Sequence, residues 1–263
     1  MAFLHRDGVA LYYERREGPG TPVVLIHGWC CDHTFFAPQA AHFADSGHDV
    51  VAVDLRGHGH SDKPHQSYPI ATFADDVVWL CGALGLVRPI LIGHSMGGVA
   101  AYDIACRHPD LPSAFVMLDS AVVRPASARA ALLRTLEGLR GANYKDILTD
   151  LVCSAFFLPT DDPSQRTRIV TTMTATPQHV MVAAYSTFAD YDAISDARRI
   201  LAPSLYIRAN EPSPLTDLER LRALIPNLLY GQTVGSGHFC QLEVPDQVNA
   251  MIDRFLRLVR PLA

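Results

Sequence analysis

The chain has 263 residues, of which 49% are hydrophobic and 19% charged, and this composition supports one globular domain with a large buried core. The net charge of −5, without a basic cluster, argues against nucleic acid and anionic membrane surfaces as partners. No apolar run has the length of a membrane span or a signal segment, and the six cysteines show no C-x-x-C spacing. We therefore expect a cytoplasmic protein with reduced cysteines.

Apolar runs alternate with helical stretches along the first half of the chain. A turn at Asp7-Gly8 followed by Leu11-Tyr12-Tyr13 predicts an N-terminal hairpin. Further buried strands are predicted at 23–26, 50–53, 90–92, 114–118, 205–207 and 228–230, and helices at about 34–46, 72–84, 96–108 and 246–259. This alternation is typical of an α/β fold with a mostly parallel central sheet and helices on both faces.

The alternation stops between residues 122 and 189, where the sequence is rich in helical patterns and holds no clear strand. Because this stretch follows Asp119 at a strand end, we expect a helical cap over the carboxyl ends of the strands, where open α/β sheets bind ligands. The predicted architecture is a single catalytic domain. Residues 1–121 and 190–263 form its α/β core, and residues 122–189 form the inserted cap.

The segment from Pro89 to Ala105 carries the strongest chemical signal. Its apolar start predicts a buried strand, residues 93–97 read G-x-S-x-G, and the remainder predicts a helix. A serine on a tight turn between strand and helix has its oxygen exposed, and small residues are needed around it because the backbones crowd there. We interpret Ser95 as a nucleophile on such an elbow.

Two other motifs offer partners for Ser95. His238, in a glycine-rich loop after the last predicted strand, can take the serine proton and return it to a leaving group. Acyl transfer also needs N–H donors for the oxyanion, which we expect from Met96 and from Trp29 in the turn after the first central strand. His58 and His60 also lie close together, but we expect no carboxylate or cysteine to join them as ligands and predict no metal site.

Four motifs together resemble the α/β-hydrolase family: G-H-S-M-G-G at 93–98, H-G-W at 27–29, D-L-R-G-H-G-H-S at 54–61 and G-H-F at 237–239. The resemblance covers nearly the whole chain except the predicted cap. It implies a catalytic triad in which an acid orients His238. In this family the acid is usually an Asp that follows the strand before the last one, but this chain has Asn210-Glu211 there.

Two residues are therefore candidates for the acid that orients His238. Some members of the family carry the acid at the end of the strand that follows the elbow helix, and that position is Asp119 in this chain. Glu211 is the alternative acid, since Asp217 lies too far into the next helix. We predict Asp119 as the acid because a triad is defined by geometry rather than by sequence position.

The resemblance implies a serine esterase or lactonase (a carboxylic ester hydrolase) that forms an acyl-enzyme on Ser95 and needs no metal or organic cofactor. We expect its substrate to be a small-molecule ester or lactone bound by Trp29, His33, Phe156 and Tyr185. Haloalkane dehalogenases and epoxide hydrolases of this fold are excluded because they have Asp in place of the serine. The oligomeric state cannot be inferred from the sequence.

Three other functions stay open. Residues 28–33, Asp119 and the run 210–212 resemble cofactor-free dioxygenases that cleave N-heteroaromatic rings on the same fold, although Met96 stands where those enzymes have histidine. In such an enzyme the histidine deprotonates the substrate, and the serine only helps to bind it. A carbon–carbon bond hydrolase acting on ring-cleavage products and a ligand receptor that keeps the fold are the other two.

Overall fold

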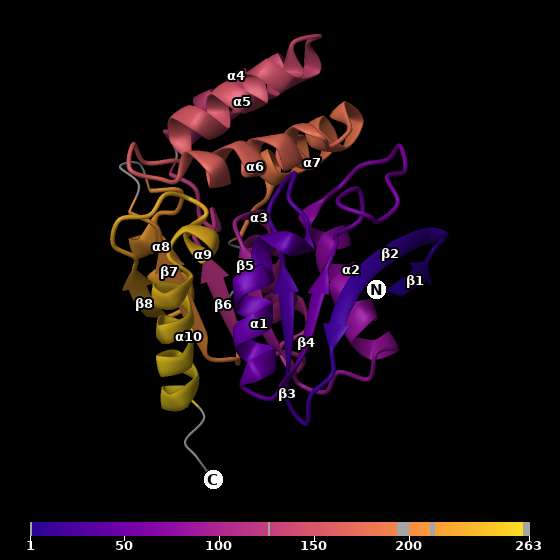
Figure 1. Ribbon diagram of the computed structural model, residues 1–263, viewed down its shortest axis with the longest axis vertical. Coiled ribbons are helices and arrows are strands. Elements are labelled where there is room, and N and C mark those ends of the chain that lie inside the picture. Colours follow the sequence, from indigo (N-terminus) through magenta and orange to yellow (C-terminus); the bar gives the residue numbers. More distant parts are fainter. Residues whose placement is uncertain (1, 126, 194–199, 211–213, 260–263) are drawn as a thin grey trace.

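The fold was examined in a computed structural model, which describes residues 2–125, 127–193, 200–210 and 214–259 (Figure 1). Its strands form one eight-stranded sheet in the order β1-β2-β4-β3-β5-β6-β7-β8. The pairs β1/β2 and β2/β4 are antiparallel and all other neighbours are parallel, which confirms the predicted α/β architecture. The strands are β1 Ala2–Arg6, β2 Val9–Arg16, β3 Gly20–Ile26, β4 His48–Val53, β5 Ile90–His94, β6 Ala114–Leu118, β7 Ser204–Arg208 and β8 Leu229–Gln232.

The four predicted helices of the core fall close to their expected positions, with one difference at the first of them, whereas the short helix Cys240–Glu243 was not predicted. The predicted helix over 34–46 is divided into a 3₁₀ turn and α1, because Asp32 caps the turn and Pro38 opens a new helix. The helical elements are η1 His33–Phe36, α1 Ala37–Asp45, α2 Ile70–Ala83, α3 Met96–Arg107, α8 Leu218–Leu224, α9 Cys240–Glu243 and α10 Pro245–Val259.

A two-residue turn joins β1 and β2, as predicted. Asp7 and Gly8 both have positive φ angles, of 52° and 77°, and this combination suits the right-handed twist of a hairpin. The register pairs Arg6 with Val9 and Ala2 with Tyr13, so the hairpin is longer than the apolar run alone suggested.

The hydrophobic core lies on both faces of the sheet, because successive side chains of a strand point to opposite faces. In β3, Val24 and Ile26 belong to the cluster that includes side chains of α2 and α3. Val23 and Leu25 belong to the other cluster, which includes side chains of α1 and α10. The central strands are buried on both faces, which is why they appear in the sequence as continuous apolar runs.

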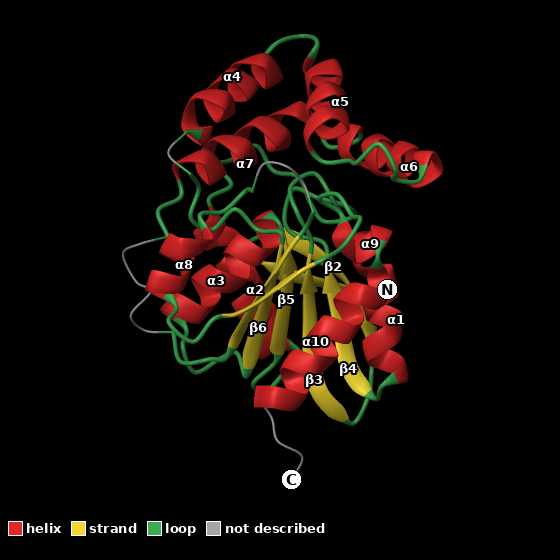
Figure 2. Cartoon of the chain, turned by 90° about the vertical axis from the view of Figure 1, so that its left-hand side faces the viewer, coloured by secondary structure: helices red, strands yellow, loops and turns green. Residues whose placement is uncertain are grey.

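Among the described residues between β6 and β7, four helices form a helical insertion over one end of the sheet (Figures 1 and 2). They are α4 Ala128–Arg140, α5 Tyr144–Ala155, α6 Pro163–Thr174 and α7 Gln178–Asp190, and they occupy the segment that the sequence assigns to a cap.

Hydrogen bonds join the helical insertion to the core. Trp29 Nε1 donates to the carbonyl of Met181 in α7 at 3.0 Å, and Thr187 Oγ1 donates to the carbonyl of Tyr68 at 2.6 Å.

Within the described part of the chain, no helix is both long and apolar enough to span a membrane.

Candidate active site

Ser95 lies on a sharp turn between β5 and α3. Its φ angle is 52° and its ψ angle is −119°, a conformation that L-residues rarely adopt and that costs on the order of 1–3 kcal/mol. The turn is possible because its neighbours are glycines: a Cβ atom on Gly93 would meet the backbone of Gly97, and one on Gly97 would meet the carbonyls of Ile26 and His27. The local sequence thus fixes a half-buried serine at the carboxyl end of a central strand.

Gly98→Ala should lower the free energy of unfolding by about 2–4 kcal/mol. A Cβ atom at this position would collide with Ser120 Oγ and lie 2.8 Å from Ser120 Cβ, in a region that is fully buried. Gly82→Ala is the matched control, because it lies in α2 with nothing within 4 Å of the added atom. The control should raise stability by up to about 1 kcal/mol. Denaturant unfolding of both variants checks this, and equal effects would contradict it.

His238 and Asp119 form a short, buried hydrogen bond. His238 Nδ1 donates to Asp119 Oδ2 at 2.6 Å, and the two residues are 3% and 0% exposed. The other carboxylate oxygen of Asp119 accepts from the N–H of Ala209 at 3.0 Å, just after β7. Asp119 itself has a φ angle of 42° at the end of β6. The acid is therefore held on both oxygens, and it orients the ring of His238.

The alternative acid, Glu211, lies outside the described residues. Its neighbour Asn210 is exposed, and its side-chain oxygen accepts from Gln232 Nε2 at 3.2 Å. The Asn210 N–H donates to the carbonyl of Ser236 at 3.0 Å, which ties this segment to the loop of His238. Asn210 thus supports the loop rather than contacting the imidazole.

The loop of His238 is packed against the helical insertion. The His238 N–H donates to the carbonyl of Phe156 at 2.8 Å. The centroids of the His238 imidazole and the Phe156 ring lie 4.4 Å apart. A Cβ atom on Gly237 would meet the same carbonyl and Asp161 Oδ2, so only glycine permits this approach. The position of His238 therefore depends on the insertion as well as on the core.

Glu243 lies under the same loop, and its titration should change stability. Its carboxylate accepts from the N–H of Gly237, while Oε1 is buried without a hydrogen-bond partner in the described structure. Burial, followed by the negative charge of Asp161, raises the pKa of Glu243 to about 7. In the unfolded chain the pKa of a glutamate is about 4.3. Between about pH 4.3 and 7 the folded protein therefore keeps a proton on Glu243 that the unfolded chain has lost. Its stability should fall as pH rises through this range.

Glu243→Gln should remove this pH dependence, because the amide cannot ionise. We expect the variant to exceed the wild type in unfolding free energy at pH 8 by up to about 3 kcal/mol, and to match it near pH 5. Glu219→Gln, at an exposed position of α8, is the control. Denaturant unfolding at both pH values measures the effect. A wild type with the same stability at pH 5 and pH 8 would contradict it.

Two further buried histidines hold the backbone around Ser95. His94 Nε2 donates to the carbonyl of His238 at 2.9 Å, and burial lowers the pKa of His94 to about 3, so the ring is neutral. His27 Nδ1 donates to the carbonyl of Gly28 at 2.8 Å, while its Nε2 accepts from the N–H of Leu55. Burial also lowers the pKa of His27. Through these hydrogen bonds, each neutral ring holds the loops around Ser95 at a fixed distance from each other.

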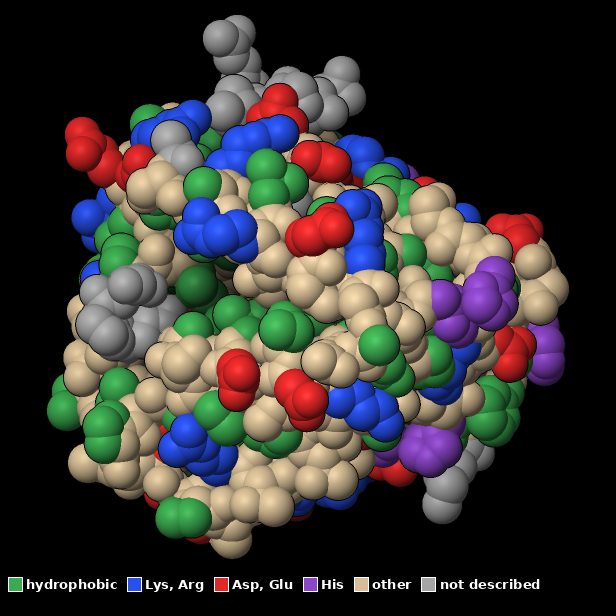
Figure 3. Space-filling model, turned by 90° about the horizontal axis from the view of Figure 1, so that it is seen from above, with side chains coloured by type: hydrophobic (Ala, Val, Ile, Leu, Met, Phe, Trp, Pro, Cys, Tyr) green, Lys and Arg blue, Asp and Glu red, His purple; other side chains and the backbone are tan. Residues whose placement is uncertain are grey.

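Ser95 and His238 lie on the wall of one cavity of about 250 Å³. Of the predicted substrate-binding residues, Trp29, Phe156 and Tyr185 line this cavity. Met96 does not line it, because its side chain points into the core, but its N–H is at the first position of α3 and has no acceptor within the helix. Seen from the side of the helical insertion, hydrophobic side chains gather in a hollow, with charged side chains above and below it (Figure 3).

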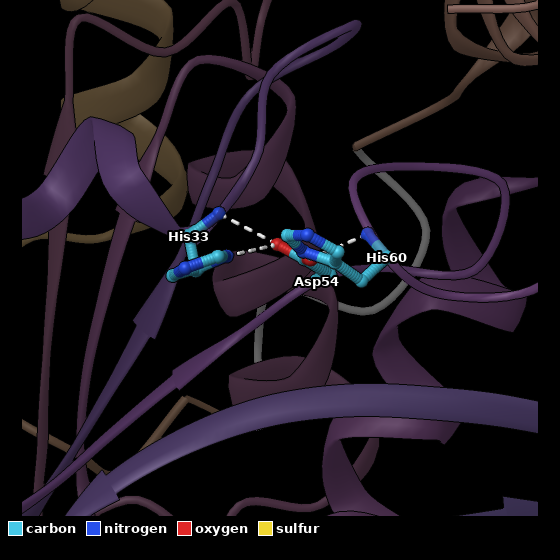
Figure 4. Close-up of side chains that lie close together, drawn as sticks. All are labelled: His33, Asp54 and His60. Carbon is cyan, nitrogen blue, oxygen red and sulfur yellow. Dashed lines mark hydrogen bonds and ion pairs between the residues drawn. The ribbon is translucent and has the colours of Figure 1, made fainter. Parts of the chain in front are cut away.

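His33, which the sequence predicts as a substrate-binding residue, does not line the cavity that Ser95 and His238 share. Its backbone N–H and its Nδ1 both hydrogen-bond to Asp54 Oδ1, at 2.7 and 2.8 Å (Figure 4). The N–H of His60 donates to the other oxygen of Asp54 at 2.7 Å. The buried carboxylate of Asp54 thus fixes the position of the His33 side chain.

The expectation that no carboxylate accompanies His60 is also wrong. His33, Asp54 and His60 bring one ligand atom each within 4.8 Å of the others, a donor set that a zinc ion accepts (Figure 4). Burial opposes ionisation of Asp54, but the hydrogen bonds from His33 and His60 outweigh it and lower its pKa to about 2. Because these bonds already satisfy both carboxylate oxygens, we interpret the cluster as a support for the loop that follows β4.

Gly28, Phe239 and Arg124 are among the cavity residues that sequence reasoning missed. A Cβ atom on Gly28 would lie 3.1 Å from His94 Nδ1 and 3.2 Å from Ser95 Cβ, so this glycine lets the turn after β3 approach the serine. Phe239 and Arg124 also line the cavity. The signal for Gly28 was its place in the H-G-W motif. Arg124 could have been noticed as a lone charge in the run Ala121-Val122-Val123-Arg124-Pro125.

Comparison with known proteins gives the family. The family model for the alpha/beta hydrolase fold matches residues 21–245. This chain belongs to the α/β-hydrolase family. Among α/β-hydrolase relatives, the AB hydrolase superfamily protein YisY of Bacillus subtilis is 27% identical over 248 residues, covering 90% of this chain and 92% of YisY.

Solved structures agree with this assignment. Est816, described as an N-acyl homoserine lactone degrading enzyme, is 29% identical with a TM-score of 0.81, and the match covers 97% of this chain and 100% of Est816. A thermophilic esterase from Thermogutta terrifontis, solved with malate bound, is 24% identical with a TM-score of 0.84, covering 98% and 97% of the two chains. The second likeness shows the α/β-hydrolase fold alone.

Proposed function

We propose that this α/β-hydrolase cleaves a small carboxylic ester or lactone through an acyl-enzyme on Ser95. The observation that carries the proposal is that Ser95, on its strained turn, and His238, bonded to Asp119, line the same cavity. A nucleophile, a base and an orienting acid are the parts that acyl transfer requires. Similarity to an enzyme described as degrading N-acyl homoserine lactones is consistent with this reaction class.

The tautomer of His238 determines its role. Because the carboxylate of Asp119 can only accept, Nδ1 of His238 carries the proton in the 2.6 Å hydrogen bond. In the neutral imidazole Nε2 then carries no proton and can accept the one on Ser95 Oγ as the oxygen attacks the carbonyl carbon. The same proton passes to the leaving alkoxide, and water repeats the sequence to release the acid and restore Ser95.

The oxyanion is proposed to bind the N–H groups of Met96 and Trp29. Met96 begins α3, so its N–H is one of the amides that a helix N-terminus leaves without an intrahelical acceptor. Trp29 follows Gly28, whose missing side chain lets the turn lie against Ser95. Each such donor contributes about 3–4 kcal/mol to transition-state stabilisation. The helical insertion would act as the cap that closes the cavity from above.

The test is a panel of p-nitrophenyl esters and lactones of increasing acyl length, combined with covalent labelling by phenylmethylsulfonyl fluoride. We expect turnover of at least one short ester and a single label on Ser95, located by peptide mass spectrometry. A label elsewhere, or full activity after labelling, would contradict the acyl-enzyme. Oxygen consumption with N-heteroaromatic substrates, in the absence of ester turnover, would favour the dioxygenase instead.

A further inference from the structure

Arg124 is the one Lys, Arg, Asp or Glu side chain among the described residues that line the active-site cavity. Most of the wall near it is apolar, and includes Ala128, Ala131, Leu132 and Leu151. We propose that Arg124 binds a carboxylate of the substrate, so that the enzyme acts on esters or lactones that carry an anionic group. This inference rests on the proposed function and specifies the substrate class of the same site.

The backbone before Arg124 is fixed on both sides. The N–H of Val123 donates to Thr216 Oγ1 at 2.9 Å, and the Val123 carbonyl accepts from the N–H of Asp217 at 2.7 Å. At the head of the side chain, Arg124 Nη2 donates to the carbonyl of Tyr191 at 3.3 Å. The guanidinium is therefore anchored where the helical insertion leaves and rejoins the core, and it is held in place before a substrate arrives.

The charge of Arg124 has a cost that a substrate carboxylate would offset. Burial lowers the pKa of Arg124, and a guanidinium remains protonated at all physiological pH values. Arg124 is half-buried beside an apolar wall and has lost part of its hydration, which the negative charge of Asp190 offsets in part, and a carboxylate entering the same cavity loses its own water. The planar fork of arginine matches a carboxylate with two parallel hydrogen bonds, so the pair compensates both losses.

The surroundings of Arg124 contain other charges. Arg124 and Leu132 also line a neighbouring pocket, which contains Arg129, Arg220, Asp190 and Asp192. None of these four charged residues lines the active-site cavity. Of the charged side chains that line the two pockets, Arg124 is therefore the one that both pockets share. Arg129 is exposed and supplies a matched control, because its removal changes the local charge by the same amount without altering the cavity wall.

The first test measures binding without turnover. Monomethyl adipate and dimethyl adipate share one skeleton and differ in a free carboxylate, and both are titrated calorimetrically into Ser95→Ala protein. We expect the monoester to bind on the order of 10- to 100-fold more tightly than the diester, the range for a hydrogen bond to a charged group. Addition of Arg124→Gln should abolish this preference, and Arg129→Gln should keep it. Equal affinity for the two ligands would overturn the proposal.

The second test measures turnover by enzyme with an intact Ser95. Mono-p-nitrophenyl adipate and its methyl ester are compared, with spontaneous hydrolysis subtracted. Arg124→Gln should lower kcat/KM for the anionic ester by about 10- to 100-fold and leave the neutral ester within about twofold, while Arg124→Lys should retain part of the preference. Equal losses on both esters would show that Arg124 only holds the fold, and would overturn the proposal.

These measurements separate the two levels of inference. Failure of the proposed function appears as loss of ester turnover and of serine labelling in the wild type, whereas the binding titration still reports on Arg124. Thermal unfolding of Arg124→Gln and Arg124→Lys establishes that each variant is folded before its affinity is interpreted. A folded Arg124→Gln variant that keeps the preference for the monoester would also contradict the proposal.

Discussion

Ser95→Ala should lower kcat for p-nitrophenyl butyrate by about 10⁶-fold, to the residual rate that the rest of the site supports. The alanine removes the oxygen that is proposed to form the acyl bond, while His238 and Asp119 remain hydrogen-bonded to each other. The measurement is burst and steady-state kinetics of wild type and variant on the same ester. Because alanine at the turn has the same backbone geometry to satisfy, thermal unfolding should change little.

The outcome of this substitution separates the reaction classes. In a serine hydrolase the loss falls on kcat, and substrate binding persists in the inactive protein. In the alternative dioxygenase, where the serine only helps to bind substrate, the loss would fall mainly on KM. Retention of full ester turnover by Ser95→Ala would refute the acyl-enzyme and favour the dioxygenase or the receptor.

Asp119→Asn is expected to lower kcat by about 10⁴-fold with little change in KM. The carboxylate accepts from both Ala209 N–H and His238 Nδ1, whereas an amide offers one oxygen acceptor and one NH₂ donor. If the amide oxygen keeps the Ala209 bond, the NH₂ group faces His238 and favours the tautomer with the proton on Nε2. That tautomer cannot accept the proton of Ser95.

The substitution is a clean probe because the backbone tolerates it. Asp119 has a φ angle of 42°, and asparagine adopts this left-handed region more readily than most residues. Glu211→Gln serves as the comparison, since it removes the other candidate acid, and we expect it to keep wild-type kcat. A large loss in Glu211→Gln, with Asp119→Asn fully active, would reverse the assignment of the acid.

Most of the fold could be predicted from local patterns. The strands at Val23–Ile26, Ile90–Ile92 and Ala114–Leu118 are continuous apolar runs because a parallel sheet buries both of its faces. The division of the first helix at Pro38 and the extension of β2 to Arg16 were not predicted. These boundaries depend on capping and on pairing with β4, which a single segment of sequence does not contain.

Prediction of the site succeeded where the chemistry is local and failed where it depends on distant loops. Phe156 and Tyr185 line the cavity as expected, but His33 is held by Asp54 and takes no part in it. His33 and Asp54 lie 21 residues apart and are brought together by the turns after β3 and β4, so their contact depends on the pairing of these two strands in the sheet. The local sequence around a histidine near a glycine turn does not show whether its side chain will line the cavity or bond to a buried carboxylate.

The sequence by itself determined the elbow, because glycines on both sides of Ser95 and the strand and helix around it are encoded in one continuous segment, Ile90 to Arg107. It also placed His238 in a glycine-rich loop after the last strand. Only the tertiary structure brought Asp119 within 2.6 Å of His238 and set Arg124 on the wall of the same cavity. The physical reason is that backbone strain and strand burial are local, whereas a hydrogen bond between β6 and the final loop depends on the order of strands in the folded sheet.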